Sequence, residues 1–70
     1  MNLEKLKNIR IEKGYTHQGL SSLLTISLAT YSKRERGIID FKIEEFENLS
    51  KTLGLSEDEV LEVLDLDYIK

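Results

Sequence analysis

The sequence predicts an all-α protein, built as one compact domain of five short helices over residues 1–70. Three observations support this prediction. Apolar residues recur every three or four positions along most of the chain, which is the spacing of one buried helix face. Capping residues and glycines stand at the ends of these apolar stretches. The chain also has no proline, and no Gly/Ser-rich stretch marks a linker between domains.

The first helix is expected from about Asn2 to Lys13. Asn2 is a suitable N-cap, because its side-chain oxygen can accept a hydrogen bond from the first turn. Gly14 follows the last expected residue and is a typical C-terminal cap. One face of this helix carries apolar residues at helical spacing: Leu3, Leu6 and Ile9.

Two further short helices are expected within about residues 16–37. Thr16 is a suitable N-cap for the first of them, which ends near Leu24, and Ser27 caps the second, which stops at Gly37. The second helix carries small, hydroxylated and basic residues. Two short helices around a tight turn fit the second helix into the major groove of DNA, which is about 12 Å wide. The pattern therefore predicts a helix-turn-helix.

A fourth helix is expected over residues 43–53 and is closed by Gly54. Its expected buried face consists of four apolar residues: Ile43, Phe46, Leu49 and Leu53. A fifth helix begins with a capping box, in which Ser56 and Glu59 exchange hydrogen bonds.

The tail of the chain allows two interpretations. Its apolar residues, Leu64, Leu66 and Tyr68, alternate with aspartates. The tail is therefore either helical or extended. An extended segment would expose a strand edge on which a second copy can pair. Residues 56–70 are therefore a candidate dimer contact.

The charge is distributed unevenly along the chain. The net charge is -3, which argues against binding to nucleic acid. Residues 1–37, however, hold seven Lys/Arg and three Asp/Glu, whereas residues 38–70 hold three Lys/Arg and ten Asp/Glu. Either the first half meets a polyanion, or both halves simply carry solvated helix faces.

Composition excludes several classes of protein. The chain has no cysteine, so neither disulfides nor a thiolate zinc site stabilise it. It has no apolar run long enough to span a membrane and no signal-peptide pattern, so we expect a cytoplasmic protein. One histidine and the absence of nucleotide-binding motifs argue against an enzyme. No cofactor, metal or small-molecule effector is expected.

Short motifs over nearly the whole chain are shared with a known family. They are Leu6-Lys7-Asn8-Ile9-Arg10, Gly14-Tyr15-Thr16, Leu20-Ser21, Ile26-Ser27, Tyr31-Ser32-Lys33, Glu35-Arg36-Gly37 and Leu53-Gly54-Leu55-Ser56. Over about residues 3–64 the sequence resembles the Cro and phage-repressor (XRE-like) helix-turn-helix family. Within that family it is most similar to small regulators of phages and mobile elements.

The resemblance implies a five-helix, lambda-repressor-like fold and a sequence-specific DNA-binding transcriptional regulator. The recognition helix would span residues 27–36 and lie in the major groove of double-stranded DNA. A homodimer would present two such helices about 34 Å apart, one DNA turn, on a two-fold symmetric operator.

Several residues of the helix-turn-helix are expected to be structural. Ser21 lies where two helices cross closely, so a small side chain is needed there. Four apolar residues are expected to fill the wedge between the helices: Leu20, Leu24, Ile26 and Tyr31. Arg10 and Glu35 match positions that form a buried ion pair in several family members. The resemblance thus implies a pair that links the first helix to the end of the recognition helix.

The residues expected against base edges lie at the start of the recognition helix and on its next turn: Leu28, Ala29 and Lys33, with Thr30 or Ser32 nearby. Lys33 can donate to guanine O6 and N7, or it can simply attract phosphate. Leu28 and Ala29 can contact a thymine methyl group. Alternatively, Leu28 packs against the domain or a partner.

The expected phosphate contacts are His17, Ser27, Arg36 and Lys42. His17 stands where the family usually has Gln. A neighbouring phosphate would favour its charged form, so that affinity would rise as the pH falls through about 6.5. The alternative is an exposed histidine without a role.

Three residues depart from the usual pattern of the family. Thr25 stands where the turn generally has Gly, so either the turn differs or a β-branched residue takes a strained positive φ. Gly19 lies inside a helix where Glu is common. Arg34 replaces an often apolar core residue, so its stem is expected to be buried with the guanidinium reaching solvent or a carboxylate.

The main alternative function is a protein-interaction module on the same scaffold, of antirepressor or antitoxin type, that does not itself read DNA. The acidic second half and the three departures favour it. A basic cluster favours DNA: Lys33, Arg34 and Arg36. An apolar group after the recognition helix exceeds what one helix face needs and suggests a partner surface: Ile38, Ile39 and Phe41.

Overall fold

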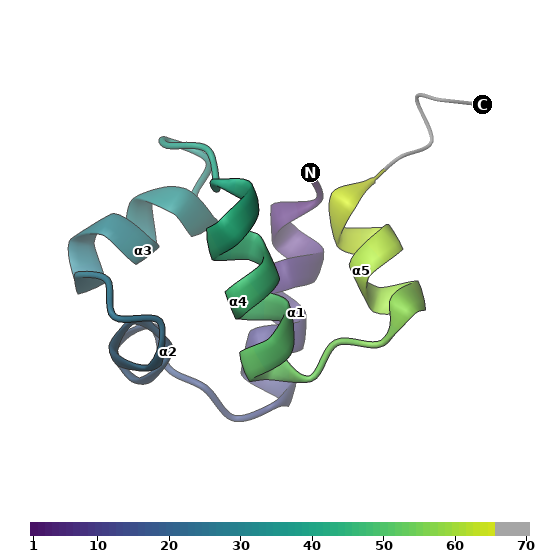
Figure 1. Cartoon of the computed structure of the whole chain (residues 1–70), viewed down its shortest axis with the longest axis horizontal. Helices are drawn as coiled ribbons and strands as arrows, with labels where there is room; N and C mark the ends of the chain where they lie inside the picture. Colours follow the sequence, from purple (N-terminus) through teal and green to yellow (C-terminus); the bar gives the residue numbers. More distant parts are fainter. Residues whose placement is uncertain (66–70) are drawn as a thin grey trace.

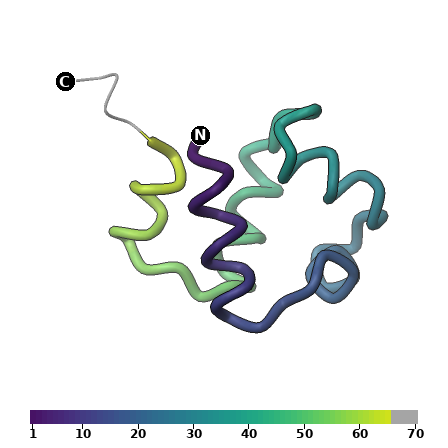
Figure 2. Tube along the Cα trace, turned by 180° about the vertical axis from the view of Figure 1, so that it is seen from behind, coloured from purple at the N-terminus to yellow at the C-terminus, as the bar shows by residue number. Residues whose placement is uncertain are grey.

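The computed structural model describes residues 1–65 of the 70-residue chain. This part folds into five helices without a strand: α1 (Leu3–Glu12), α2 (His17–Leu23), α3 (Leu28–Glu35), α4 (Ile43–Leu53) and α5 (Glu57–Leu64). Figures 1 and 2 show α2 and α3 together at one end of the molecule and α5 at the other, with α1 and α4 between them. The predicted all-α, five-helix fold is confirmed.

Side-chain caps set where four of the helices begin. Asn2, Thr16 and Ser27 each accept a hydrogen bond from the backbone N–H three residues later, at 2.9–3.0 Å. Ser56 does the same for Glu59 at 3.2 Å, and the Glu59 carboxylate accepts the Ser56 N–H at 3.0 Å, which completes the predicted capping box. The predicted caps are thus confirmed.

The fourth helix begins differently, because a lysine side chain has no acceptor with which to cap the first turn. Instead, the Glu45 carboxylate reaches back and accepts the backbone N–H of Lys42 at 2.8 Å. At its other end α4 stops at Gly54, which takes a left-handed conformation with φ +66°.

The core consists of eight buried apolar residues drawn from all five helices: Leu6, Ile9, Leu20, Tyr31, Phe46, Leu49, Leu53 and Val63. The predicted wedge is present, with Leu20 and Tyr31 fully buried and Leu24 and Ile26 packed against the core at partial burial. Ser21 is buried, as expected for a helix crossing. Ile43 departs from the expected buried face of α4, because 79% of it is exposed.

The two ends of the described chain are tied together. The Asn2 N–H donates to the carbonyl of Val63 at 2.6 Å, which fixes the start of α1 beside the end of α5. Leu64 is the last residue of α5, so at this residue the chain is helical rather than extended. The remaining tail residues of the proposed strand and dimer contact, 66–70, lie outside the described residues. Within residues 1–65, none of the helices has the length and hydropathy needed to cross a membrane.

Candidate nucleic-acid interface

The turn between α2 and α3 keeps a left-handed residue without using glycine. Thr25 has φ +56°, and its hydroxyl donates to the carbonyl of Leu24 at 2.7 Å. The Ile26 N–H donates to the carbonyl of Ser21 at 3.1 Å, which closes the turn onto α2. A left-handed conformation costs a residue with a side chain about 1–2 kcal/mol. Of the two outcomes left open by the sequence, the strained turn is the one observed.

The outer face of α3 is open to solvent at three of the five expected base-contacting positions. Leu28 is 46% exposed, and Ala29 and Lys33 are exposed as well. Thr30 and Ser32 are only partly exposed. The Thr30 hydroxyl also accepts a 2.8 Å hydrogen bond from the Ser27 hydroxyl. The exposed surface of α3 is therefore apolar at its start and cationic one turn later.

The inner face of α3 is fixed by a buried polar network centred on Glu35, which is 5% exposed. The guanidinium of Arg10 forms a bidentate pair with the Glu35 carboxylate, through Nε at 2.9 Å and a terminal nitrogen at 3.2 Å. The Tyr31 hydroxyl donates to the same carboxylate at 2.6 Å. Arg10 also donates to the carbonyl of Tyr15 at 2.7 Å. The ion pair implied by the resemblance is thus present, and it joins α1 to the end of α3.

This network sets the charge state of its members. Burial favours the protonated form of Glu35, but hydrogen bonds from Tyr31, Arg10 and His17 outweigh burial and lower the pKa of the Glu35 carboxyl. Burial, together with the hydrogen bond to Glu35, raises the pKa of Tyr31 well above its usual value. The network therefore holds an anionic carboxylate and a neutral phenol.

His17 belongs to this network, which the sequence did not predict. Its Nε2 lies 3.0 Å from Glu35 Oε1, and its ring centroid lies 5.8 Å from that of Tyr31. The side chain is still 38% exposed. The ring is therefore anchored on α3, which the interpretation of His17 as a merely exposed residue did not include. Its expected contact with phosphate remains a prediction.

A comparison with known families agrees with this geometry. The model of a helix-turn-helix family matches residues 6–60, from the middle of α1 to the middle of α5. The chain belongs to the XRE/Cro-type helix-turn-helix family. It is accordingly a DNA-binding helix-turn-helix protein of the regulator type. No curated protein and no solved structure matches the chain.

One member of the basic cluster of this helix-turn-helix protein is paired inside the protein. Arg34 is 9% exposed, donates to the carbonyl of Asp40 at 2.6 Å and pairs with Glu45 at 3.0 Å. Its Nε is buried and has no partner within the described residues. The carboxylate expected for this side chain is thus Glu45, and Arg34 is not a free cation of the basic cluster.

Three of the four expected phosphate contacts remain exposed: Ser27, Arg36 and Lys42. Arg36 lies directly after α3, and Lys42 directly before α4. The dual role of Glu45, which caps α4 and holds Arg34, was missed by the sequence analysis. The one signal for it was a Glu at the third position of a helix, and the capping-box pattern was incomplete because Lys42 is not a capping residue.

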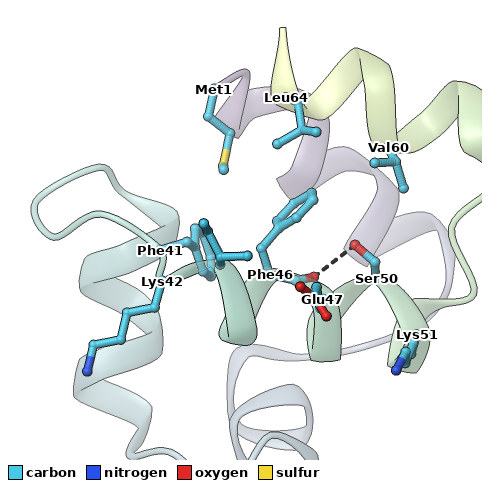
Figure 3. Close-up of a pocket in the computed structure, with 10 residues that line it drawn as sticks. Met1, Phe41, Lys42, Phe46, Glu47, Ser50, Lys51, Val60 and Leu64 are labelled. Atoms are coloured by element: carbon cyan, nitrogen blue, oxygen red, sulfur yellow. Dashed lines mark hydrogen bonds between the residues drawn. The ribbon is translucent and has the colours of Figure 1, made fainter. Parts of the chain in front are cut away.

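A second surface lies away from the helix-turn-helix. Figure 3 shows a groove beside α4, where Met1 and Leu64 face Phe46 and where the side chain of Lys42 points away. Its volume is about 530 Å³, and its lining is largely apolar. The predicted apolar group after α3 is divided. Ile38 and Ile39 are exposed, whereas Phe41 is half-buried and makes an edge contact with the Tyr31 ring at 6.3 Å.

Proposed function

We propose that this protein is a sequence-specific transcriptional regulator of the phage-repressor or Cro type, which places residues 27–36 in the major groove. The observation that carries the proposal is the division of α3 into two faces. Its inner face is held on α1 by the Glu35 network, and its outer face is exposed and carries no acid. A helix whose exposed face is apolar at its start and cationic one turn later can approach base edges without repulsion from phosphate.

The exposed residues suggest how bases are read. Lys33 donates to guanine O6 and N7, and Leu28 and Ala29 pack on a thymine methyl group. Thr30 and Ser32 supply hydroxyls at the edge of this contact. Because one side chain, Lys33, provides most of the polar readout, we expect modest discrimination, of about 1–3 kcal/mol at its base pair.

Phosphate contacts would come from Ser27, Arg36 and Lys42 on either side of α3, with His17 at the start of α2. Two of these expected phosphate contacts are exposed cations, Arg36 and Lys42. Each phosphate that a cation neutralises contributes about 0.9 to the slope of log affinity against log salt. The expected slope is therefore about -2 per protomer.

A homodimer on a two-fold symmetric operator is the form we propose on DNA. Exposed apolar residues support it, notably Leu61 on α5 and Ile43 on α4, which are 54% and 79% exposed. Burying such residues against a second copy would stabilise the pair by about 25 cal/mol for each Å² of apolar surface. Residues 56–70 remain the candidate contact. A protein that binds DNA must share a compartment with it, so the cytoplasmic location remains part of the proposal.

The groove beside α4 favours a second candidate function, binding of a protein partner without DNA reading. The groove of about 530 Å³ is largely apolar and includes the exposed Ile43, which is typical of a surface that binds a partner. The inward position of Arg34 weakens the cationic character of the recognition helix and points the same way.

Selection from a pool of random duplexes at near-physiological salt, followed by a salt titration, separates the two functions. DNA reading predicts enrichment of a two-fold symmetric site with the salt slope given above. The variant Lys33→Ala should weaken binding to that site and relax the preference at one base pair. The matched control Lys7→Ala removes the same charge from an exposed residue of α1 outside the proposed DNA and dimer contacts, so it should change neither affinity nor preference. Absence of enrichment would refute DNA reading and favour the protein partner.

A further inference from the structure

The anchoring of His17 on Glu35 has a consequence for DNA binding. We propose that His17 binds a DNA phosphate through Nδ1 as an imidazolium, so that operator binding takes up a proton at this ring. The inference rests on the proposed DNA-reading function. It goes beyond that function because it ties affinity to pH through one residue.

The first step concerns which ring nitrogen carries the proton when the ring is neutral. An ionised carboxylate accepts hydrogen bonds and cannot donate them. Glu35 accepts two bonds from Arg10 and one from Tyr31, and its hydrogen bonds keep the carboxyl ionised. The 3.0 Å contact with His17 is therefore a hydrogen bond only if Nε2 donates. The neutral ring of His17 is thus held with its proton on Nε2.

The second step concerns the other nitrogen. Nδ1 has no hydrogen-bond partner within residues 1–65. It is also not one of the buried polar atoms of these residues, so it can reach a ligand from solvent. With the proton on Nε2, a neutral ring presents only the Nδ1 lone pair, which repels a phosphate oxygen. Protonation converts Nδ1 into a charged donor while Nε2 stays on Glu35. A phosphate contact by His17 therefore requires the charged ring.

The third step concerns the charges that face the ring. α1 contributes Arg10 and α3 contributes Tyr31 and Glu35, whereas the rest of α2 carries no charged residue. Arg10 already neutralises Glu35 at 2.9 Å, so the charge of a protonated His17 remains available to phosphate. Glu35 stays anionic and Tyr31 neutral between pH 5.5 and 8, because the pKa of the first is lowered and that of the second is raised. Neither Glu35 nor Tyr31 therefore adds a pH response of its own over that range.

The test measures the dissociation constant for the selected duplex between pH 5.5 and 8.0 at constant ionic strength. A charge-assisted hydrogen bond contributes about 1.5–3 kcal/mol, and 1.4 kcal/mol is tenfold in affinity. Wild-type affinity should therefore fall by about tenfold or more across this range. His17→Gln keeps a neutral donor at every pH, so its affinity should stay nearly constant. Melting of both free proteins across the same range corrects for any change in the folded fraction.

The chain contains one histidine, so ring nitrogen signals in nuclear magnetic resonance belong to His17 without assignment. We expect a neutral ring to carry its proton on Nε2 in the free protein, and both nitrogens to carry a proton in the complex. Calorimetry in two buffers of different ionisation enthalpy should show uptake of up to about one proton by wild type and none at this site in His17→Gln. A purely structural role would alter melting but would leave the ring neutral in the complex.

Three results would overturn the inference. Equal pH profiles for wild type and His17→Gln refute it while leaving DNA reading intact, and so does a neutral ring in the complex. Absence of an enriched duplex at both pH 6 and pH 8 refutes DNA reading itself and the inference with it. A pH-dependent affinity that disappears in His17→Gln, together with proton uptake on binding, supports it.

Discussion

Replacing Glu35 with alanine removes the centre of the polar network. The Glu35 carboxylate is 5% exposed and accepts hydrogen bonds from Arg10, Tyr31 and His17. In Glu35→Ala, the Arg10 guanidinium stays buried at 6% exposure and keeps its bond to the carbonyl of Tyr15, but it loses its counter-charge. The variant therefore leaves a buried cation without a partner charge, which is the most costly way to break an ion pair.

The expected loss is large relative to the stability of so small a domain. Removing one partner of a buried pair costs about 3–5 kcal/mol. The free energy of unfolding of native domains is about 0.05–0.15 kcal/mol per residue, so that of this chain should be about 4–10 kcal/mol. Glu35→Ala should therefore lose between about a third of its stability and all of it. Glu35→Gln keeps the shape of the side chain and part of its hydrogen bonding, so it should lose less and remain folded.

Urea denaturation followed by circular dichroism at low temperature measures both losses. The matched control is Glu62→Ala, which breaks the 3.1 Å pair between Glu62 and Lys5 on the surface. Solvent screens that pair, so its removal should hardly change the free energy of unfolding. If Glu35→Ala were no more destabilising than Glu62→Ala, the argument that the buried network holds α3 in place would be wrong.

Two further predictions concern stability. Burial opposes ionisation of Glu35, but its hydrogen bonds outweigh burial and lower its pKa below the unfolded value of about 4.3. The ionised Glu35 therefore contributes its full stability above the unfolded pKa. This stability is lost as the pH falls through the lower pKa of the folded protein. Wild type should therefore lose stability below about pH 4 more steeply than Glu35→Gln, and equal urea midpoints from pH 6 to 2 would contradict this. Thr25→Gly should raise the free energy of unfolding by about 1 kcal/mol, because glycine takes a φ of +56° without strain. The greater conformational entropy of glycine in the unfolded chain offsets part of this stabilisation. A lower urea midpoint for Thr25→Gly would contradict the strain.

Local signals were sufficient to predict the helices. The expected first helix, Asn2 to Lys13, differs from α1 only by its two cap residues. Thr16 and Ser27 cap where their side chains predicted, because N-capping is decided within four residues of sequence. The left-handed Thr25 was one of two outcomes that the comparison with the family's usual Gly left open. Signals confined to a few neighbouring residues therefore carried most of the fold.

The features that the sequence did not predict depend on contacts between residues far apart in the chain. His17 and Glu35 are 18 residues apart, and neither residue type indicates which way the ring turns. Arg34 meets Glu45 only because α4 packs beside the end of α3. Counting charges along the chain treats every arginine as a free surface cation, and this assumption fails for Arg34 because its guanidinium is paired inside the protein.

The pairing of arginines inside the protein changes what the charge asymmetry means. Arg10 and Arg34 are two of the seven Lys/Arg in residues 1–37, and each is buried against a glutamate. DNA would therefore meet a lightly charged surface around Lys33 and Arg36. On such a surface one additional charge at His17 is a large fraction of the total, so the pH response should be strongest at low salt and shrink as salt screens the phosphates. If His17 binds phosphate as we propose, a weakly cationic recognition surface and a histidine anchored on Glu35 make operator affinity sensitive to proton and salt concentration together.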